Sequence, residues 1–297
     1  MEDVGDQLEL LTSINLDDLV SAFGWQDRPF LARLLRRIFF KPAQTLASYV
    51  VEFDNAVEAL GLADASRLIT KRFVKDVRVF GSDLIPDSAF LALSNHPGMT
   101  DTVSLFCALN IPQLKIIALD RPFLTALPNT SRQLFYVKDD PASRMALVRQ
   151  VSGHLRAGGA ALTFPAGEIE PDPAVYPGAA ESLRGWADSV GVFLRMAPET
   201  AILPVLVRNV IWDKTANFAL LKLKKSSKER EKLAAALQLL AMILWDIKPV
   251  SVTVQIGRPL TTRALGTNNT NDIHAAVLAE MKRLIENPPA GEGISVL

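Results

Sequence analysis

The sequence contains few of the residues that several common enzyme chemistries need. One of its 297 residues is cysteine, Cys107, and three are histidine. A single cysteine excludes an intrachain disulfide, and for Cys107, in a predicted helix, packing is a simpler role than catalysis. The chain has no His-Glu-x-x-His helix, Gly-x-Ser-x-Gly nucleophile elbow, Walker A loop or dinucleotide-binding glycine fingerprint. The corresponding zinc-hydrolase, serine-hydrolase, P-loop and Rossmann chemistries therefore lack their motifs.

The chain also lacks an excess of either charge and a long apolar run. Its 32 lysines and arginines balance 32 aspartates and glutamates, which removes the global electrostatic case for a nucleic-acid partner. No uninterrupted apolar run reaches the roughly 18 residues of a membrane-spanning helix. Residues 1–18 are acidic and lack the basic-then-apolar order of a signal peptide. We therefore expect a cytoplasmic protein that is soluble or peripheral at the inner membrane face.

Short apolar runs alternate with helical patterns from residue 76 to about residue 290. The predicted strands are residues 77–80, 90–93, 114–118, 134–137, 160–164, 201–207 and 250–256. The predicted helices are residues 102–109, 141–157, 179–190, 218–247 and 272–286. This alternation predicts an α/β fold with a mixed central sheet flanked by helices.

Residues 1–75 instead predict a separate N-terminal helical region, preceding an α/β domain at residues 76–290. Residues 28–40 place large apolar side chains at helical spacing among several arginines, a pattern typical of a helix lying on an anionic membrane surface. An ordinary helix packed on the domain with solvated arginines fits equally well. Pro42 is expected to end this helix, and residues 44–60 to form another, stopped by Gly61.

A polar turn after one predicted strand holds the best candidate for a catalytic base. Residues 90–93 are apolar, His96 lies in the Ser-Asn-His-Pro-Gly turn that follows, and Asp101 comes five residues later. A neutral imidazole accepts a proton near pH 7, and a carboxylate improves it by fixing its tautomer. With Asp101 in the first turn of the next helix, the two side chains could meet at the carboxyl end of a strand. The spacing alone fits a second interpretation equally well, in which His96 is an ordinary loop histidine and Asp101 is an aspartate favoured by the dipole at a helix N-terminus.

The other two histidines are weaker candidates. His154 shares a helix with Leu147 and Val151 and is expected to border the core. His274 lies near the start of the last helix and is expected to face solvent. No pairing of the three histidines gives metal-ligand spacing, so no metal site is predicted.

Three blocks of sequence, in the same order and at the same spacing, resemble the glycerolipid (lysophospholipid/glycerol-phosphate) acyltransferase family. The first is Asn95-His96-Pro97-Gly98-Met99-Thr100-Asp101, which resembles the Asn-His-x-x-x-x-Asp motif of that family. The second is Leu162-Thr163-Phe164-Pro165-Ala166-Gly167-Glu168, which is similar to the Phe-Pro-Glu-Gly-Thr-Arg block. The third is Ala201-Ile202-Leu203-Pro204-Val205, which is similar to the Ile-Val-Pro-Val strand. The resemblance covers residues 75–260.

The resemblance implies an acyltransferase that needs no cofactor or metal. His96, oriented by Asp101, would act as general base while a lyso-lipid or glycerol-phosphate-type acceptor attacks the thioester of acyl-CoA or acyl carrier protein. The expected partners are this donor, the lipid acceptor and a membrane surface, with no nucleic acid. The sequence leaves open a second function, a non-catalytic lipid- or acyl-chain-binding protein on the same scaffold.

The second block departs from the family at the positions that would face the acceptor. Ala166 stands where the family has an acidic residue, and Glu168-Ile169 where it has Thr-Arg. An acidic side chain there would repel a phosphate and favour a cationic or neutral acceptor. The predicted substrate-binding residues are Asn95, Phe164, Pro165, Gly167 and Glu168, with Lys138 and Arg144, and also Arg121, as anion holders. Without the resemblance, the second block could be a rigid connection between elements, and each of the three basic residues could be a solvated surface charge.

Overall fold

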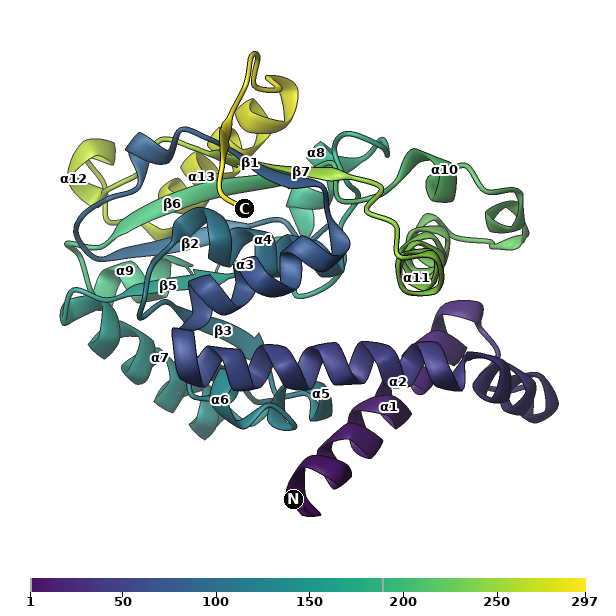
Figure 1. The fold of residues 1–297 in the computed structure, drawn as a ribbon. Helices are drawn as coiled ribbons and strands as arrows, with labels where there is room; N and C mark the ends of the chain where they lie inside the picture. The colour runs from purple at the N-terminus through teal and green to yellow at the C-terminus, as the bar shows by residue number, and fades with distance from the viewer. Residues whose placement is uncertain (1, 189) are drawn as a thin grey trace.

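The structure, a computed structural model that describes residues 2–188 and 190–297, is an α/β fold built on one mixed sheet (Figure 1). In the described residues the sheet has eight strands in the order β4-β3-β5-β2-β6-β7-β1-β8. The strands are β1 Asp76–Phe80, β2 Phe90–Ser94, β3 Lys115–Leu119, β4 Leu134–Val137, β5 Ala160–Thr163, β6 Ala201–Arg208, β7 Ser251–Ile256 and β8 Ile294–Ser295. Neighbours run parallel except in the β6–β7 and β1–β8 pairs. The predicted fold class is confirmed, and each predicted strand overlaps an observed one.

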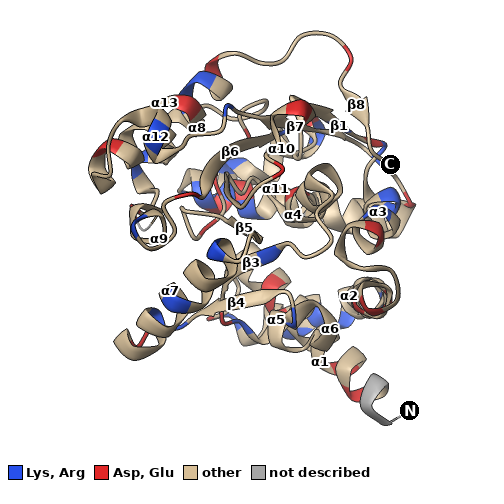
Figure 2. Cartoon of the chain, turned by 90° about the vertical axis from the view of Figure 1, so that its left-hand side faces the viewer, with Lys and Arg blue, Asp and Glu red and all other residues tan. Residues whose placement is uncertain are grey.

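Helices cover both faces of this sheet (Figure 2). The long helices are α1 Glu2–Phe23, α2 Pro29–Leu60, α3 Leu62–Phe73, α4 Met99–Leu109, α7 Pro141–Arg156, α9 Val190–Met196, α11 Ser227–Trp245 and α13 Thr270–Glu286. The short ones are η1 Ser82–Leu84, α5 Pro122–Thr125, α6 Pro128–Ser131, α8 Ala179–Ser182, η2 Leu183–Gly185, α10 Asp213–Ala216, η3 Ala219–Leu223 and α12 Thr262–Leu265. Figure 2 also shows basic and acidic segments interspersed over these helices, as the balanced charge predicts.

Strand β2 lies between two parallel neighbours and is buried along its whole length. Its side chains alternate between two cores. Phe90 and Ala92 pack with residues of α2, α3 and α4, whereas Leu91 and Leu93 pack with residues of α7, α9 and α13. A strand that is covered on both faces has apolar residues at successive positions, and this explains why β2 could be predicted from the sequence.

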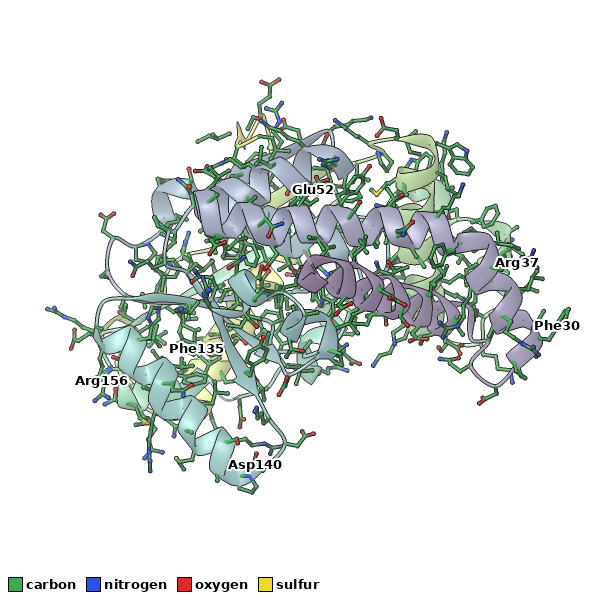
Figure 3. All side chains as sticks on the ribbon, turned by 60° about the horizontal axis from the view of Figure 1, so that its bottom comes forward. Phe30, Arg37, Glu52, Phe135, Asp140 and Arg156 are labelled. Atoms are coloured by element: carbon green, nitrogen blue, oxygen red, sulfur yellow. The ribbon has the colours of Figure 1, made fainter. Side chains whose placement is uncertain are left out.

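The N-terminal region differs from the prediction at Pro42. This residue lies inside one continuous helix, α2, and does not end it. The missing amide and the bulk of the ring bend the helix instead, and in Figure 3 the ribbon turns between the labelled Arg37 and Glu52. Pro42 is buried, and Asn15 of α1 donates a hydrogen bond to the carbonyl oxygen of Ala43 at 3.1 Å. Packing against α1 therefore holds the two halves of the bent helix together.

Helices α2 and α3 contribute Leu46, Val57 and Phe73 to the same core as the sheet. A domain boundary at residue 75 stays a prediction. No helix among the described residues is long and apolar enough to cross a bilayer.

Two of the predicted helices are interrupted. Residues 179–190 form only α8 and η2 before the chain becomes extended at Trp186, because the indole turns into the core; residue 189 of that prediction lies outside the described residues. Residues 218–247 divide into η3 and α11 at Ser226. The Ser226 side chain accepts a hydrogen bond from the Glu229 amide, a capping box that starts a new helix.

Candidate active site

The polar turn predicted to hold a base lies at the carboxyl end of β2, the strand at the centre of the sheet. Because β5 and β6 run parallel to β2, the loops that follow all three strands emerge at the same edge. The Pro-rich loop after β5 and the segment 209–212 after β6 therefore flank the turn. The second sequence block therefore lies at the same end of the sheet as His96.

His96 and Asp101 are in direct contact. The Nδ1 atom of His96 lies 2.8 Å from Oδ2 of Asp101, whose side chain is 0% exposed. The same carboxylate accepts hydrogen bonds from the Gly98 amide and the Thr102 hydroxyl, each at 2.9 Å. With the carboxylate accepting at Nδ1, that nitrogen carries the hydrogen and Nε2 carries the lone pair. Nε2 makes no hydrogen bond to any described residue, and the imidazole is 30% exposed.

The surroundings of His96 favour its protonated form on balance. Burial is the largest single influence and pushes the pKa of the imidazole down. The charge and the hydrogen bond of Asp101, together with the charge of Glu170, outweigh burial and raise the pKa above its usual value. Arg121 opposes them and lowers the pKa. The imidazole is therefore a stronger base than a free histidine.

Glu170, a residue that the sequence did not mark, hydrogen-bonds to the backbone of the turn that carries His96. Its amide donates to the carbonyl oxygen of His96 at 2.9 Å, and Oε2 of its carboxylate accepts from the His96 amide at 3.3 Å. Oε1 accepts from the Ser182 hydroxyl and the Trp186 indole. Burial raises the pKa of Glu170, and these three donors oppose the rise. The only signal in the sequence was its position two residues after the second block.

Asp172, also missed, ties the loop after β5 to the segment after β6. Its fully buried carboxylate accepts four backbone N–H bonds, from Ala174, Asn209, Val210 and Ile211, at 2.7–3.1 Å. Burial raises the pKa of Asp172, and the amides oppose that rise. The two loops that flank His96 are thus held in one arrangement by a single side chain.

Asn95 directs its side chain into the sheet. Its amide nitrogen donates to the Val207 carbonyl oxygen at 2.9 Å, and its amide oxygen accepts from the Val207 amide at 2.8 Å. The side chain thereby extends the β2–β6 ladder beyond the end of β2. A substrate contact by Asn95 stays a prediction.

The second block forms one side of the site. The ring of Phe164 lies 4.8 Å from the ring of His96, centroid to centroid. The Pro165 carbonyl accepts from the amide of Ala187. Gly167 has a φ of +65°, so glycine is needed there for the turn itself. Glu168 is exposed and forms an ion pair with Lys228 of α11 at 2.6 Å. The negative charge expected to repel a phosphate is therefore offset by a lysine.

The predicted anion holders lie at different distances from the base. Lys138 and Arg144 follow β4, an edge strand three positions from β2, and both are exposed and paired, with Asp120 and Asp139 respectively. Arg121 follows β3 and is close enough for its charge to lower the pKa of His96. Arg121 therefore acts electrostatically on His96. No group of three His, Cys, Asp or Glu in residues 2–188 and 190–297 is arranged to hold a metal ion.

Comparison with known proteins finds similarity among solved structures. No family model matches the sequence, and a search of curated proteins finds no match. Among solved structures, the chain is similar to the crystal structure of the 1-acyl-sn-glycerophosphate (LPA) acyltransferase PlsC from Thermotoga maritima. The two chains are 17% identical, the match covers 94% of this chain and 98% of that one, and the TM-score is 0.48.

Proposed function

We propose that the protein is an acyltransferase that moves a fatty acyl group from a thioester donor to a lipid-type acceptor. The observation that carries this proposal is the state of His96. Its Nδ1 is held by a buried carboxylate, while its Nε2 makes no hydrogen bond to the residues that the structure describes. In a serine or cysteine hydrolase that nitrogen would contact an enzyme nucleophile. Here the nucleophile comes from outside, as the hydroxyl or amine of an acceptor.

The reaction follows from this arrangement. Nε2 of His96 takes the proton as the acceptor oxygen or nitrogen attacks the thioester carbonyl. Asp101 stabilises the imidazolium. The tetrahedral intermediate then expels the donor thiolate, which takes the proton back from the imidazolium. The developing oxyanion needs donors, and the first turn of α4 has backbone amides without helical partners. The amide of Gly98 is not among these donors, because it is bound to Asp101.

The acceptor is a lyso-lipid or a glycerol-phosphate-type molecule. The Glu168–Lys228 pair makes the loop after β5 nearly neutral, so it does not by itself exclude a phosphate. Arg121, the basic residue that acts on His96, is the group we assign to an anionic acceptor. Acyl-CoA and acyl carrier protein both provide the required thioester.

We further propose that the protein works as a peripheral protein at the inner membrane face, where it meets lipid acceptors. The first half of α2 carries Phe30, Leu34 and Ile38 one helical turn apart, and Phe30 is 71% and Ile38 59% exposed. Figure 3 places Phe30 at the outer end of this segment. Arg28, Arg33, Arg36, Arg37 and Lys41 lie among them. Exposed apolar side chains flanked by cations suit the interface of an anionic bilayer.

Release of free thiol from long-chain acyl-CoA tests the enzymatic proposal. The acceptors are glycerol 3-phosphate, lysophosphatidate, a neutral lysolipid and an amine-bearing lysolipid, and acyl carrier protein is the alternative donor. Wild type and His274→Ala, the control histidine variant, should turn over, whereas His96→Ala should lose at least 100-fold in kcat. Tight lipid or acyl-CoA binding without turnover, unchanged in His96→Ala, would establish the binding-protein alternative instead.

Co-sedimentation with vesicles tests the membrane proposal. The double variant Phe30→Ser/Ile38→Ser should bind vesicles of phosphatidylglycerol and phosphatidylcholine at least tenfold more weakly than wild type. Leu68→Ser removes an apolar side chain of α3 that is 52% exposed, and is the control. Equal binding by all three proteins, or no dependence on the anionic lipid, would reject this surface as the docking site.

A further inference from the structure

Arg208, the last residue of β6, carries a buried charge with no carboxylate in contact. Its side chain is 5% exposed, and no ion pair of the described residues includes it. Nη2 donates to the Leu284 carbonyl at the end of α13, at 2.6 Å. Nε is buried and has no hydrogen-bond partner in the structure. Nη2 also donates to the Gln255 side chain at 3.4 Å. Buried guanidinium groups are normally paired with an anion, and these neutral acceptors satisfy only part of the hydrogen-bonding capacity of Arg208.

A second arginine lies in the same row of the sheet. Arg208 of β6 is in register with Thr253 of β7, and Thr253 is in register with Arg78 of β1. Residues in register on neighbouring strands project from the same face. Two cations therefore extend over one face of the sheet, with a hydroxyl between them. Arg78 is paired with Asp76, and Asn209 donates to the Thr253 hydroxyl at 3.1 Å.

These residues line one hollow of about 300 Å³. The segment that follows α13, drawn in yellow beside β1 and β7 in Figure 1, forms its other side. Phe80, Pro288 and Pro289 give an apolar wall, and the exposed Glu292 contributes the one carboxylate of the lining. A basic floor with apolar walls is the usual make-up of a site for an anion that carries an organic group.

We propose that this hollow binds a phosphate-bearing anion between Arg78 and Arg208. The planar guanidinium fork matches phosphate oxygens in pairs, and the Thr253 hydroxyl lies between the two arginines to donate a third bond. Burial lowers the pKa of Arg208, and the charge of Asp172 opposes this. An anion in the hollow would add to the stabilisation that Asp172 and the carbonyl oxygens at the end of α13 already give the guanidinium. Glu292 competes with the anion. The site does not depend on the proposed acyl transfer.

Calorimetry of the full-length protein at low salt tests the proposal with inorganic phosphate and adenosine 5′-monophosphate as probes. Arg78→Gln should weaken binding of both at least tenfold, and Glu292→Gln should tighten it severalfold because a competing carboxylate is removed. Arg78 is partly exposed, so its variant is expected to fold where Arg208→Gln could fail. Arg149→Gln, on the exposed side of α7, is the matched control and should bind as wild type does.

The two probes separate the two sources of the phosphate. Tighter binding of the nucleotide identifies a phosphate monoester whose organic part contacts Phe80 and the prolines, whereas equal affinities identify the free ion; both support the proposal. It is overturned if neither probe binds at millimolar concentrations, or if binding is the same in Arg78→Gln as in wild type. Because binding is measured without turnover, failure here is distinct from failure of the acyltransferase proposal.

Discussion

Glu170 and His96, 74 residues apart in the chain, hold each other through two hydrogen bonds. The amide of Glu170 donates to the His96 carbonyl, and the amide of His96 donates to the Glu170 carboxylate. One residue thereby fixes the backbone of the turn and places a negative charge near the imidazole. The structural and electrostatic parts of this role can be separated by experiment.

The pH dependence of turnover should change in Glu170→Gln. The base must be neutral to act, so wild-type activity should rise with pH through the raised pKa of His96. Removing the charge of Glu170 destabilises the imidazolium and lowers that pKa, which moves the rising limb to lower pH. Ser182→Ala removes a hydrogen bond to Glu170 but keeps the charge, so its profile should match wild type. A Glu170→Gln profile centred where the wild-type one is would contradict the electrostatic role.

Asp101→Asn should lower kcat by about a thousandfold or more while KM changes little. The carboxylate sets the tautomer of His96 and stabilises the imidazolium, and the amide of asparagine does neither. Measuring kcat and KM separately distinguishes this effect from weaker acceptor binding. A loss below about threefold would mean that His96 does not act as a base with Asp101 as its orienter.

Asp172→Asn should lower the free energy of unfolding by about 2–4 kcal/mol. The carboxylate accepts four amides with two oxygens, whereas an asparagine presents an NH₂ group to two of them and leaves those buried donors unsatisfied. Urea denaturation followed by circular dichroism measures the change. The exposed Asp87→Asn is the control and should stay within about 0.5 kcal/mol of wild type. If the two variants are equally stable, the hydrogen bonds of Asp172 between the loops after β5 and β6 do not contribute to the stability of the protein.

Lys228→Ala should alter acceptor preference more than stability. Both partners of the Glu168–Lys228 pair are more than half exposed, so the pair contributes less than about 1 kcal/mol. Without the lysine, the charge of Glu168 is no longer offset, and KM for a phosphate-bearing acceptor should rise relative to that for a neutral one. Adding Glu168→Gln should restore the wild-type ratio. A ratio unaffected by either change would place Glu168 away from the bound acceptor.

The sequence predicts the elements of the fold well where one physical signal is enough. Strand β2 is apolar throughout because both its faces are covered, and α7 begins at Asp140 and Pro141, an N-cap followed by a proline. Pro42 misleads because its local cost is smaller than the packing that α2 gains against α1. Trp186 misleads because its burial interrupts a helical pattern that the neighbouring residues would otherwise continue.

The candidate site is predictable only where its parts are close in sequence. His96 and Asp101 meet within one turn and the start of one helix, so their spacing carries the information. Glu170 and Asp172 bind backbone groups that are distant in sequence, at His96 and in segment 209–211, and only the order of the strands places these groups beside them. The bonds that the Asn95 side chain makes to Val207 could not be predicted either, because only the order of strands brings β6 beside the turn.

The bond between Asn95 and Val207 joins residues 112 positions apart, and this separation has a consequence for how the protein is made. During synthesis His96 and Asp101 leave the ribosome well before β5 and β6, the strands that enclose β2. Until residue 208 has emerged, one edge of an apolar central strand is open to pairing with other chains. The nascent chain therefore passes through an aggregation-prone interval, and a chaperone that covers β2 during that interval should raise the yield of active protein.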